Sequence, residues 1–263
     1  MAPLQLTAEI LRRETIAPEL IRLTFLAPDL AAAARPGQFL MLRVGEGRDP
    51  LLRRPLSIHQ VTSNGWVQVL FKVVGQGTRL LAALAPGQGV DVVGPLGNRF
   101  AMESHGNHCL IGGGMGIAPL YFLARELERS NPPERVVPLL GARTAKELRP
   151  LADDFVALGL EPRLATDDGT LGHHGLVIDH LSELMASGEP WRVYTCGPYP
   201  MMRAVAKICR EQGWECQVSL ETMMACGISA CLGCAIPAAQ LDGPYKHVCK
   251  DGPVFGAEEV AWL

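Results

Sequence analysis

The sequence predicts a β + α/β protein with three parts: an N-terminal antiparallel β-barrel, a central doubly wound parallel α/β sheet and a small C-terminal domain. Three observations predict this class. Short apolar stretches separated by turn residues fill the first hundred residues, strand–turn–helix units then repeat, and several cysteines gather in a final stretch that has little periodicity. We expect the domains to span residues 1–103, 104–215 and 216–263.

The N-terminal region has the pattern of an all-β domain. Short apolar segments alternate with Pro-Gly, Asn-Gly and Gly-Pro turn signals, as is typical of an antiparallel barrel or sandwich. The segments expected to form strands are residues 19–28, 37–44, 54–61, 66–74 and 89–97.

The central region changes to apolar strands that alternate with amphipathic helices. This alternation predicts a parallel sheet covered by helices on both faces. The expected strands are residues 109–114, 136–142, 161–168, 191–197 and 216–221. The residues that follow are too few to form a core alone without a cross-link or a metal.

Composition excludes several classes of function. The net charge is −3, the pI is near 6.2 and the Lys and Arg residues are scattered, so we expect no nucleic-acid partner. The N-terminus lacks a signal-peptide pattern, and no apolar stretch approaches the roughly 20 residues needed to cross a bilayer. We therefore expect a cytoplasmic protein without a membrane partner, whose eight cysteines are thiols, metal ligands or core residues.

The most specific motif is a group of four cysteines with the spacing C-x4-C-x2-C followed by a longer gap. Its members are Cys226, Cys231, Cys234 and Cys249. This is the plant-type spacing that wraps a loop around a [2Fe–2S] cluster. A structural zinc site is the alternative, although it usually joins two short C-x2-4-C knuckles. Unliganded core thiols are the third interpretation.

The other cysteines divide into two kinds. Cys109, Cys209 and Cys216 lie on apolar faces and are expected to be small buried hydrophobes. Cys196 instead ends a strand inside "TCGPYPMM", where an open parallel sheet places a ligand-facing loop.

Two loops of the central region together predict a dinucleotide site. "IGGGMGIAPL" is a glycine-rich turn between a strand and a helix, where backbone amides and a helix N-terminus can face a pyrophosphate. Alone it is weak, because any tight strand-to-helix turn needs glycines. The "CGPYP" loop at the end of a later strand strengthens the prediction. The residues concerned are Gly112, Gly113, Gly114, Gly116, Cys196, Gly197 and Pro198.

The barrel carries two candidate anion sites. In "RRPLSI", the Arg54 guanidinium suits a diphosphate and the Ser57 hydroxyl suits a ring nitrogen. In "GQGTRLL", glycines end a strand and a helix begins at Thr78. Each could equally be an exposed arginine on an edge strand and a capped helix, but the two together favour a second nucleotide cofactor.

Two further sequence features lie near the expected nucleotide site. "TDDGTLGHHG" is expected to be a βα loop with His173 and His174 in solvent, and no metal is assigned to it. Arg143 follows the second strand, where a cation can tolerate a 2′-phosphate, but one arginine does not overturn NAD.

The motifs resemble the ferredoxin–NADP reductase superfamily and, within it, the electron-transfer subunits of bacterial class 1B dihydroorotate dehydrogenases. The resemblance covers essentially the whole chain through "RPLS", "GQGT", "GGGMGIAPL", "CGPYPMM" and "MACGISACLGC" with a later cysteine. The first four motifs occur across the superfamily, whereas the order and spacing of all five are specific.

The resemblance implies cofactor contacts for several residues. It assigns contacts with FAD to Arg54, Pro55, Leu56, Ser57, Leu70, Phe71 and Lys72, the FAD diphosphate to Gly77 and Thr78, and the cluster to the four cysteines. The family loop often reads Cys-Gly-Ile-Gly, and Ser229 takes the place of that second glycine here. The departure calls into question any backbone conformation that only glycine adopts easily.

Electron counting orders the cofactors. A nicotinamide exchanges a hydride, an iron–sulfur cluster passes single electrons and a flavin does both, so FAD belongs between NAD and the cluster. The resemblance implies an oxidoreductase subunit of pyrimidine biosynthesis. It supplies a separate FMN-containing dihydroorotate dehydrogenase catalytic subunit, with two copies of each subunit in a heterotetramer.

Two other functions stay open. One is the flavin and iron–sulfur subunit of an NADH-dependent ferredoxin:NADP oxidoreductase or of a sulfhydrogenase. By resemblance, the former tends to replace one cluster cysteine with aspartate, so four cysteines favour the dihydroorotate assignment. The other is a non-enzymatic nucleotide-binding module with a structural zinc knuckle.

Overall fold

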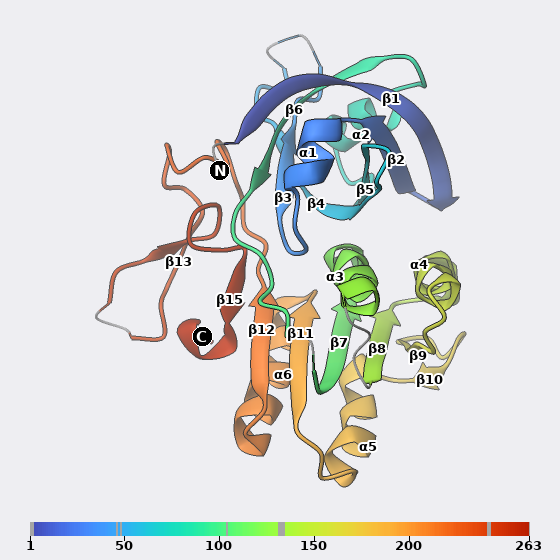
Figure 1. Ribbon diagram of the computed structural model, residues 1–263, viewed down its shortest axis with the longest axis vertical. Coiled ribbons are helices and arrows are strands. Elements are labelled where there is room, and N and C mark those ends of the chain that lie inside the picture. Colours follow the sequence, from blue (N-terminus) through green and yellow to red (C-terminus); the bar gives the residue numbers. More distant parts are fainter. Residues whose placement is uncertain are drawn as a thin grey trace.

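A computed structural model describes residues 3–45, 47, 49–103, 105–130, 135–240 and 243–262. In Figure 1 a barrel lies at the top and a helix-covered sheet lies below it, with the C-terminal segment beside both. Within the described residues, no helix has both the length and the apolar character that crossing a bilayer requires.

The N-terminal part is a closed barrel of antiparallel strands in the order β1-β2-β5-β4-β3-β6. The strands are β1 (Leu4–Ala17), β2 (Leu20–Leu26), β3 (Phe39–Leu42), β4 (Arg54–Val61), β5 (Trp66–Lys72) and β6 (Gly89–Leu96), with helices α1 (Pro28–Ala33) and α2 (Gln76–Ala82). The predicted barrel is confirmed. Strand β1 was not predicted, because several of its residues face solvent and its apolar alternation is weak.

The central part is a seven-stranded sheet in the order β10-β9-β8-β7-β11-β12-β15. Its strands are β7 (Asn107–Gly113), β8 (Arg135–Ala142), β9 (Arg163–Thr166), β10 (His173–His174), β11 (Trp191–Cys196), β12 (Glu215–Ser219) and β15 (Val254–Gly256). All neighbours pair in parallel except β12 and β15. The order reverses between β7 and β11, which makes that position the switch point of the predicted doubly wound sheet.

Helices cover both faces of this sheet. They are α3 (Ile117–Ser130), α4 (Ala145–Ala157), α5 (Leu181–Ala186) and α6 (Tyr199–Gln212). Helices α3 and α4 contact each other and the barrel strands β4 and β1, whereas α5 and α6 both contact the short 3-10 helix η2 (Val177–His180). One correction concerns His173 and His174, which form the short edge strand β10 rather than part of a loop, although both are exposed as expected.

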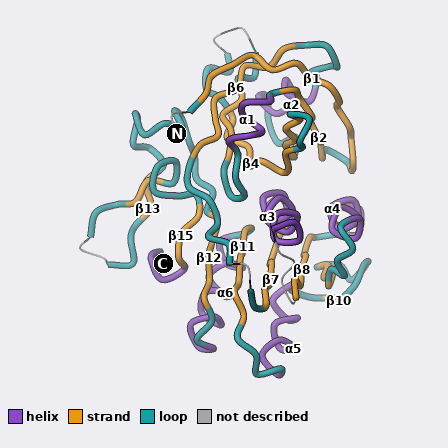
Figure 2. The backbone as a smooth tube through the Cα atoms, in the orientation of Figure 1, coloured by secondary structure: helices purple, strands orange, loops and turns teal. Residues whose placement is uncertain are grey.

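The C-terminal segment returns to the sheet. After β12 the chain makes a long excursion that is mostly loop in Figure 2. Among its described residues, 220–240 and 243–253, the only strands are the short pair β13 (Ala235–Ile236) and β14 (Lys246–His247). It ends in β15, where Ser219 pairs with Val254. The predicted boundary between residues 215 and 216 falls at the start of β12, so the cysteine-bearing segment leaves the sheet only after Ser219.

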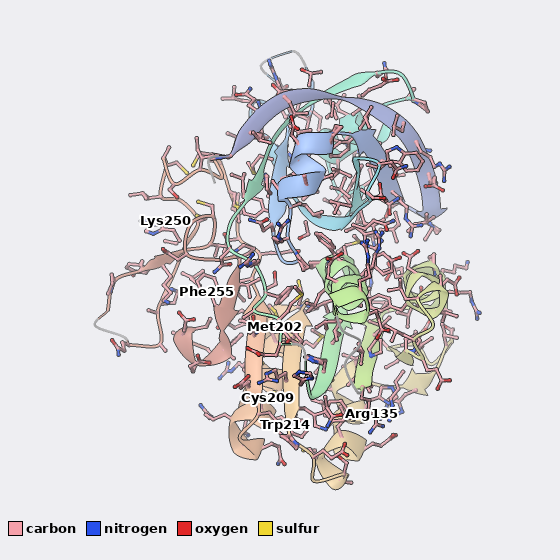
Figure 3. The ribbon with its side chains drawn as sticks, viewed as in Figure 1. Arg135, Met202, Cys209, Trp214, Lys250 and Phe255 are labelled. Carbon is pink, nitrogen blue, oxygen red and sulfur yellow. The ribbon has the colours of Figure 1, made fainter. Side chains whose placement is uncertain are left out.

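The buried residues of this segment that the structure describes pack into the core of the sheet. Cys234, Cys249 and Phe255 belong to the same hydrophobic cluster as Met202 and Cys209 of helix α6. Figure 3 labels Met202, Cys209 and Phe255 in this region. The excursion is too small to form a core alone, and the sheet supplies one.

The three cysteines predicted to be small buried hydrophobes are Cys109, Cys209 and Cys216, and all three are buried. Burial raises the pKa of the Cys109 thiol well above its ordinary value. These thiols are therefore packing residues, as expected.

An ion pair fastens the barrel to helix α4. Arg22 on β2 contacts the Asp154 carboxylate, and both side chains are largely buried, at 17% and 18% exposed. His59 on β4 is buried beside them, with its Nδ1 3.0 Å from the Ala118 carbonyl oxygen. Because the pair lies at the junction of two domains, removal of the carboxylate would leave the Arg22 guanidinium largely buried without a counter-charge.

We predict that Asp154→Asn lowers the free energy of unfolding by about 2 kcal/mol, because Arg22 keeps its charge without a counter-charge. Asp153→Asn is the matched control, since Asp153 is exposed on the same helix and its loss changes stability by about 0.5 kcal/mol or less. Denaturant unfolding of the cofactor-loaded protein measures both. Equal midpoints for the two variants would contradict the role of the pair.

Candidate functional site

The glycine-rich turn and the Cys-Gly-Pro loop meet at the switch point. Strands β7 and β11 are neighbours, so both loops leave the same edge of the sheet. A Cβ atom on Gly116 would lie 2.2 Å from the Cys196 carbonyl oxygen, and one on Gly197 would lie 2.9 Å from the Gly113 nitrogen. The two backbones therefore touch at a distance that side chains would prevent.

The remaining glycines of the turn have separate roles. A Cβ on Gly112 would lie 2.7 Å from Ile117 Cγ1, so this glycine lets helix α3 pack on its strand. Gly114 has a left-handed backbone at φ +54° and faces open space. The turn thus brings Gly113 and Gly114 to the surface of a cavity.

That cavity has a volume of about 550 Å³ and lies along the carboxyl ends of the strands. The glycine-rich turn contributes Met115 to its lining and the Cys-Gly-Pro loop contributes Pro198. The Cys196 thiol is buried, at 1% exposed, and burial raises its pKa, so it stays a neutral group beneath the loop. A mostly apolar cavity at a switch point is the usual place for a dinucleotide.

A second hollow of about 280 Å³ opens between the barrel and the sheet. The predicted residues that line it are Pro55, Leu56, Ser57, Leu70, Phe71, Lys72 and Thr78. We call it the barrel cleft. It shares Lys72 and Met115 with the first cavity, so the two spaces adjoin.

Arg54 and Gly77 lie beside the barrel cleft and against each other. A Cβ on Gly77 would lie 2.5 Å from Arg54 Nε, so only glycine lets the guanidinium cover the first turn of α2. The Thr78 hydroxyl accepts hydrogen bonds from the Val74 and Gly75 N–H groups at 3.0 and 3.1 Å. Thr78 therefore shapes the turn with its side chain, which leaves the helix backbone to face a ligand.

An ion-pair network across the first cavity was not predicted. Lys72 Nζ of the barrel lies 2.7 Å from Glu147 Oε1 on α4, and Arg143 Nη2 lies 2.8 Å from the same oxygen. Hydrogen bonds from Arg143 and then Lys72 lower the pKa of Glu147 to about 2. The sequence offered no signal for this pairing, because Lys72 and Glu147 are far apart along the chain.

Residues just after β12 were also missed. Glu221, Thr222 and Met224 line the barrel cleft, although they belong to the C-terminal segment that carries the cysteines. Their position after the last parallel strand is the only signal that would have found them. They place the wall of the cleft within a few residues of Cys226.

The first two cysteines of the motif form one pair. The Cys226 sulfur accepts hydrogen bonds from the Ala230 and Cys231 N–H groups, both at 3.3 Å. The Cys231 sulfur accepts one from the Gly233 N–H at 3.4 Å. Burial raises the pKa of Cys226, but the N–H groups of Cys231 and Ile228 outweigh it and lower the pKa to about 7. This loop is thus built to hold negative sulfur.

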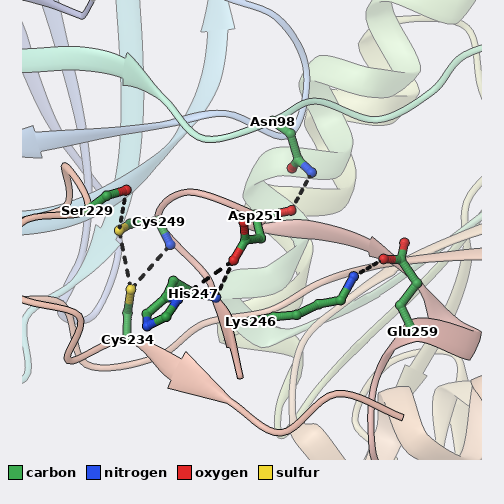
Figure 4. A network of polar contacts seen from close by, with 8 residues as sticks. All are labelled: Asn98, Ser229, Cys234, Lys246, His247, Cys249, Asp251 and Glu259. Atoms are coloured by element: carbon green, nitrogen blue, oxygen red, sulfur yellow. Dashed lines mark hydrogen bonds and ion pairs between the residues drawn. The ribbon is translucent and has the colours of Figure 1, made fainter. Parts of the chain in front are cut away.

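The last two cysteines form a second, buried pair. Cys234 Sγ lies 3.3 Å from Cys249 Sγ, and the Cys249 N–H donates to the Cys234 sulfur at 3.4 Å. The two side chains are 2% and 5% exposed. Burial and the neighbouring Cys234 raise the pKa of Cys249. Figure 4 shows this pair, with Ser229 above it.

The arrangement of the four thiols can be compared with the needs of a zinc site and of an iron–sulfur cluster. A single zinc ion needs four ligands around one point. Among the described residues, no three His, Cys, Asp or Glu side chains gather in that way. A cluster with two irons needs two thiolates for each iron, and the chain presents two pairs of thiols. The donor set, with its two pairs of thiols, fits a cluster with two irons.

Ser229 adopts a backbone conformation of the kind that glycine adopts more easily. Ser229 has φ +63° and Leu232 has φ +57°, so the loop takes left-handed conformations at two residues that are not glycine.

Comparison with known proteins identifies the family. A protein of Desulforamulus reducens named "Dihydroorotate dehydrogenase B (NAD(+)), electron transfer subunit" is 41% identical over 265 residues, which cover 97% of each chain. A protein of the same name from Geobacillus thermodenitrificans is 39% identical over 95% of this chain and 96% of its own length. This chain belongs to that family of electron transfer subunits.

Three domain families match this chain one after another. Residues 7–100 match an oxidoreductase FAD-binding domain, and residues 110–207 match an oxidoreductase NAD-binding domain. Residues 221–261 match the iron–sulfur cluster binding domain of dihydroorotate dehydrogenase B. The predicted classes of cofactor, FAD, NAD and an iron–sulfur cluster, are confirmed by these matches.

A solved structure shares the whole architecture. An NADH-dependent reduced ferredoxin–NADP oxidoreductase superimposes with a TM-score of 0.86 at 33% identity, covering 97% of this chain and 90% of that one. The predicted superfamily and fold are therefore confirmed. The higher identity of the dihydroorotate dehydrogenase B subunits places this chain with them rather than with the alternative.

We predict that Gly116→Ala weakens NADH-dependent reduction of the flavin on the order of 100-fold, because the new methyl group would push apart the two loops that shape the nucleotide cavity. FAD content should stay unchanged, since Gly116 does not line the barrel cleft. Gly45→Ala is the control, because a Cβ there meets no atom within 4 Å. Stopped-flow reduction with NADH gives the rates, and a wild-type rate for Gly116→Ala would refute the close-contact role.

Proposed function

We propose that this chain takes electrons from an FMN-containing catalytic subunit, which oxidises dihydroorotate to orotate, and delivers them through a [2Fe–2S] cluster and FAD to NAD⁺. One observation carries the proposal. The barrel cleft shares Lys72 and Met115 with the nucleotide cavity, and its far wall includes Thr222 and Met224 of the cysteine-bearing segment. A cofactor in the cleft would therefore have the other two sites on either side.

The barrel supplies the groups that would hold FAD. The Arg54 guanidinium over the first turn of α2 suits the diphosphate, together with the backbone N–H groups of Gly77 and Thr78. The Ser57 hydroxyl suits a polar edge of the ring, and Leu56, Leu70 and Phe71 supply apolar walls. Pro55 and Lys72 complete the lining on this side.

The sheet supplies the groups that would hold the nicotinamide nucleotide. Gly113 and Gly114 offer backbone to the pyrophosphate, and Pro198 limits where the ring can lie. Four residues of these loops that do not line the cavity set its shape through close packing: Gly112, Gly116, Cys196 and Gly197. When bound, FAD would exchange a hydride with this nucleotide and single electrons with the cluster, which joins a two-electron carrier to a one-electron carrier.

The two thiol pairs would each bind one iron of the cluster, Cys226 with Cys231 and Cys234 with Cys249. The N–H groups aimed at the sulfurs stabilise their negative charge, and burial of the second pair keeps water away. We propose that FAD, the nicotinamide nucleotide and the cluster belong to three domains, which span residues 1–103, 104–215 and 216–263.

The surface near the cysteines supports a partner subunit. Met223, Ile228 and Leu232 are exposed at 92%, 52% and 55%, and all three lie within or beside the first cysteine loop. In the complex, the catalytic subunit would cover these exposed apolar side chains beside the redox centre. We further propose a heterotetramer with two copies of each subunit, working in the cytoplasm where free thiols persist.

The proposal predicts that Cys231→Ser abolishes electron transfer from dihydroorotate to NAD⁺ in the complex reconstituted with the FMN subunit, because the first iron loses a ligand. FAD content and direct flavin reduction by NADH should persist. Cys209→Ala serves as the control, since that thiol is a buried packing residue of helix α6 and is not one of the four cysteines of the motif. Visible spectra and coupled NADH formation report both properties, and full coupled activity in Cys231→Ser would overturn the assignment.

The structure also predicts a preference for NAD over NADP. Asp167 lines the nucleotide cavity, and the Arg143 guanidinium is already paired with Glu147. A carboxylate there suits ribose hydroxyls and repels a 2′-phosphate. We expect Asp167→Ser to lower KM for NADPH about tenfold or more, from the loss of roughly 1.4 kcal/mol of repulsion.

The matched control is the neighbouring Asp168→Asn. The Asp168 carboxylate accepts from the Thr170 N–H at 3.0 Å and does not line the cavity. Its removal should leave the ratio of NADH to NADPH activity close to that of the natural protein. A similar shift in both variants would indicate a general charge effect rather than a role for Asp167.

A further inference from the structure

Ser229 makes a contact that a glycine at this position would lack. It lies in the loop between Cys226 and Cys231, and its hydroxyl oxygen is 3.8 Å from the sulfur of Cys249. Cys249 comes from a separate stretch of chain, on the far side of β13 and β14. Figure 4 shows the Ser229 hydroxyl directed at this sulfur. The contact therefore joins the two halves of the cysteine motif.

The direction of this hydrogen bond follows from the chemistry of the ligand. A cysteine that binds iron is a thiolate and has no proton to donate. The hydroxyl of Ser229 must then be the donor and the Cys249 sulfur the acceptor. Glycine at position 229 has no hydroxyl, so it would lack this hydrogen bond to the Cys249 sulfur.

Burial of Cys249 makes a single hydrogen bond to its sulfur important. Cys249 is only 5% exposed, so water cannot replace a missing donor at its sulfur. Cys226, by contrast, accepts from several backbone N–H groups of its own loop. The sulfur of Cys249 thus depends more on a single side chain than the sulfur of Cys226 does.

We propose that the Ser229 hydroxyl donates to the Cys249 thiolate and raises the reduction potential of the cluster above the value that glycine at this position would give. Hydrogen bonds to the sulfurs stabilise the more negative, reduced state of the cluster. Ser229 is thereby a positioning and tuning residue rather than a ligand. The inference rests on the proposed cluster at the four cysteines.

The backbone gives a second reason to assign Ser229 a role. Its φ of +63° lies in the left-handed region, where glycine is comfortable and serine is strained. Packing of the loop therefore does not require serine, because glycine would fit the backbone better. The hydroxyl is what this residue adds.

The test uses Ser229→Ala and Ser229→Gly in the full chain, purified without oxygen with FAD and cluster bound. A potentiometric titration followed by the paramagnetic signal of the reduced cluster gives its midpoint potential. We expect both variants to shift this potential to more negative values by the same amount, with the flavin potential and the iron content unchanged. Equal shifts would assign the effect to the hydroxyl, since alanine keeps the strain and glycine relieves it.

Two further measurements sharpen the result. The iron–sulfur stretching bands of the natural protein should move in D₂O, and the part of that shift due to the hydroxyl should be absent in both variants. Ser182→Ala removes an exposed hydroxyl that donates to the Asp179 carbonyl oxygen at 2.8 Å, and it should change nothing.

An unchanged midpoint potential in both variants would overturn the proposal, and so would a shift in only one of them. Absence of iron and sulfide from the natural protein would instead refute the proposed function itself. The two failures are therefore distinguishable in the same set of samples.

Discussion

The pairing of Ser219 with Val254 is the constraint on which the rest of the structure depends. It closes the base of the excursion that carries all four cysteines of the motif and fixes that excursion to the last strand of the parallel sheet. Asn98 strengthens the closure, because its side chain donates to the Val254 carbonyl oxygen at 2.7 Å and accepts from the Val254 N–H at 3.0 Å. A segment too small to fold alone is thus held by the barrel and the sheet together, and its cysteines acquire fixed positions.

This anchoring also determines the order of the three sites. The chain leaves β12 along the wall of the barrel cleft and reaches Cys226 within a few residues. On the other side of the cleft, Met115 of the glycine-rich turn borders the nucleotide cavity. The cleft therefore lies between the cysteines and the cavity because of how the chain is routed, and a cofactor that handles both single electrons and hydride has its place there.

Local sequence patterns predicted most of the fold and the separate pieces of the site. The alternation of strands and helices, the cysteine spacing and the glycine turns are short-range signals, and the structure has these features. Contacts between distant residues could not be predicted. Strand β15 has only three residues and no periodicity, and Arg22 reaches Asp154 across two domains. Likewise the spacing of the four cysteines said nothing of how they pair, which depends on the path of the chain between Cys234 and Cys249.

The most direct test of the account is the composition and spectrum of the metal site in protein purified without oxygen. We expect iron and acid-labile sulfide in equal amounts, two of each for every FAD, and a signal from a single unpaired electron after reduction with dithionite. One zinc ion for each chain without sulfide would contradict the central claim that two thiol pairs hold a two-iron cluster beside the flavin.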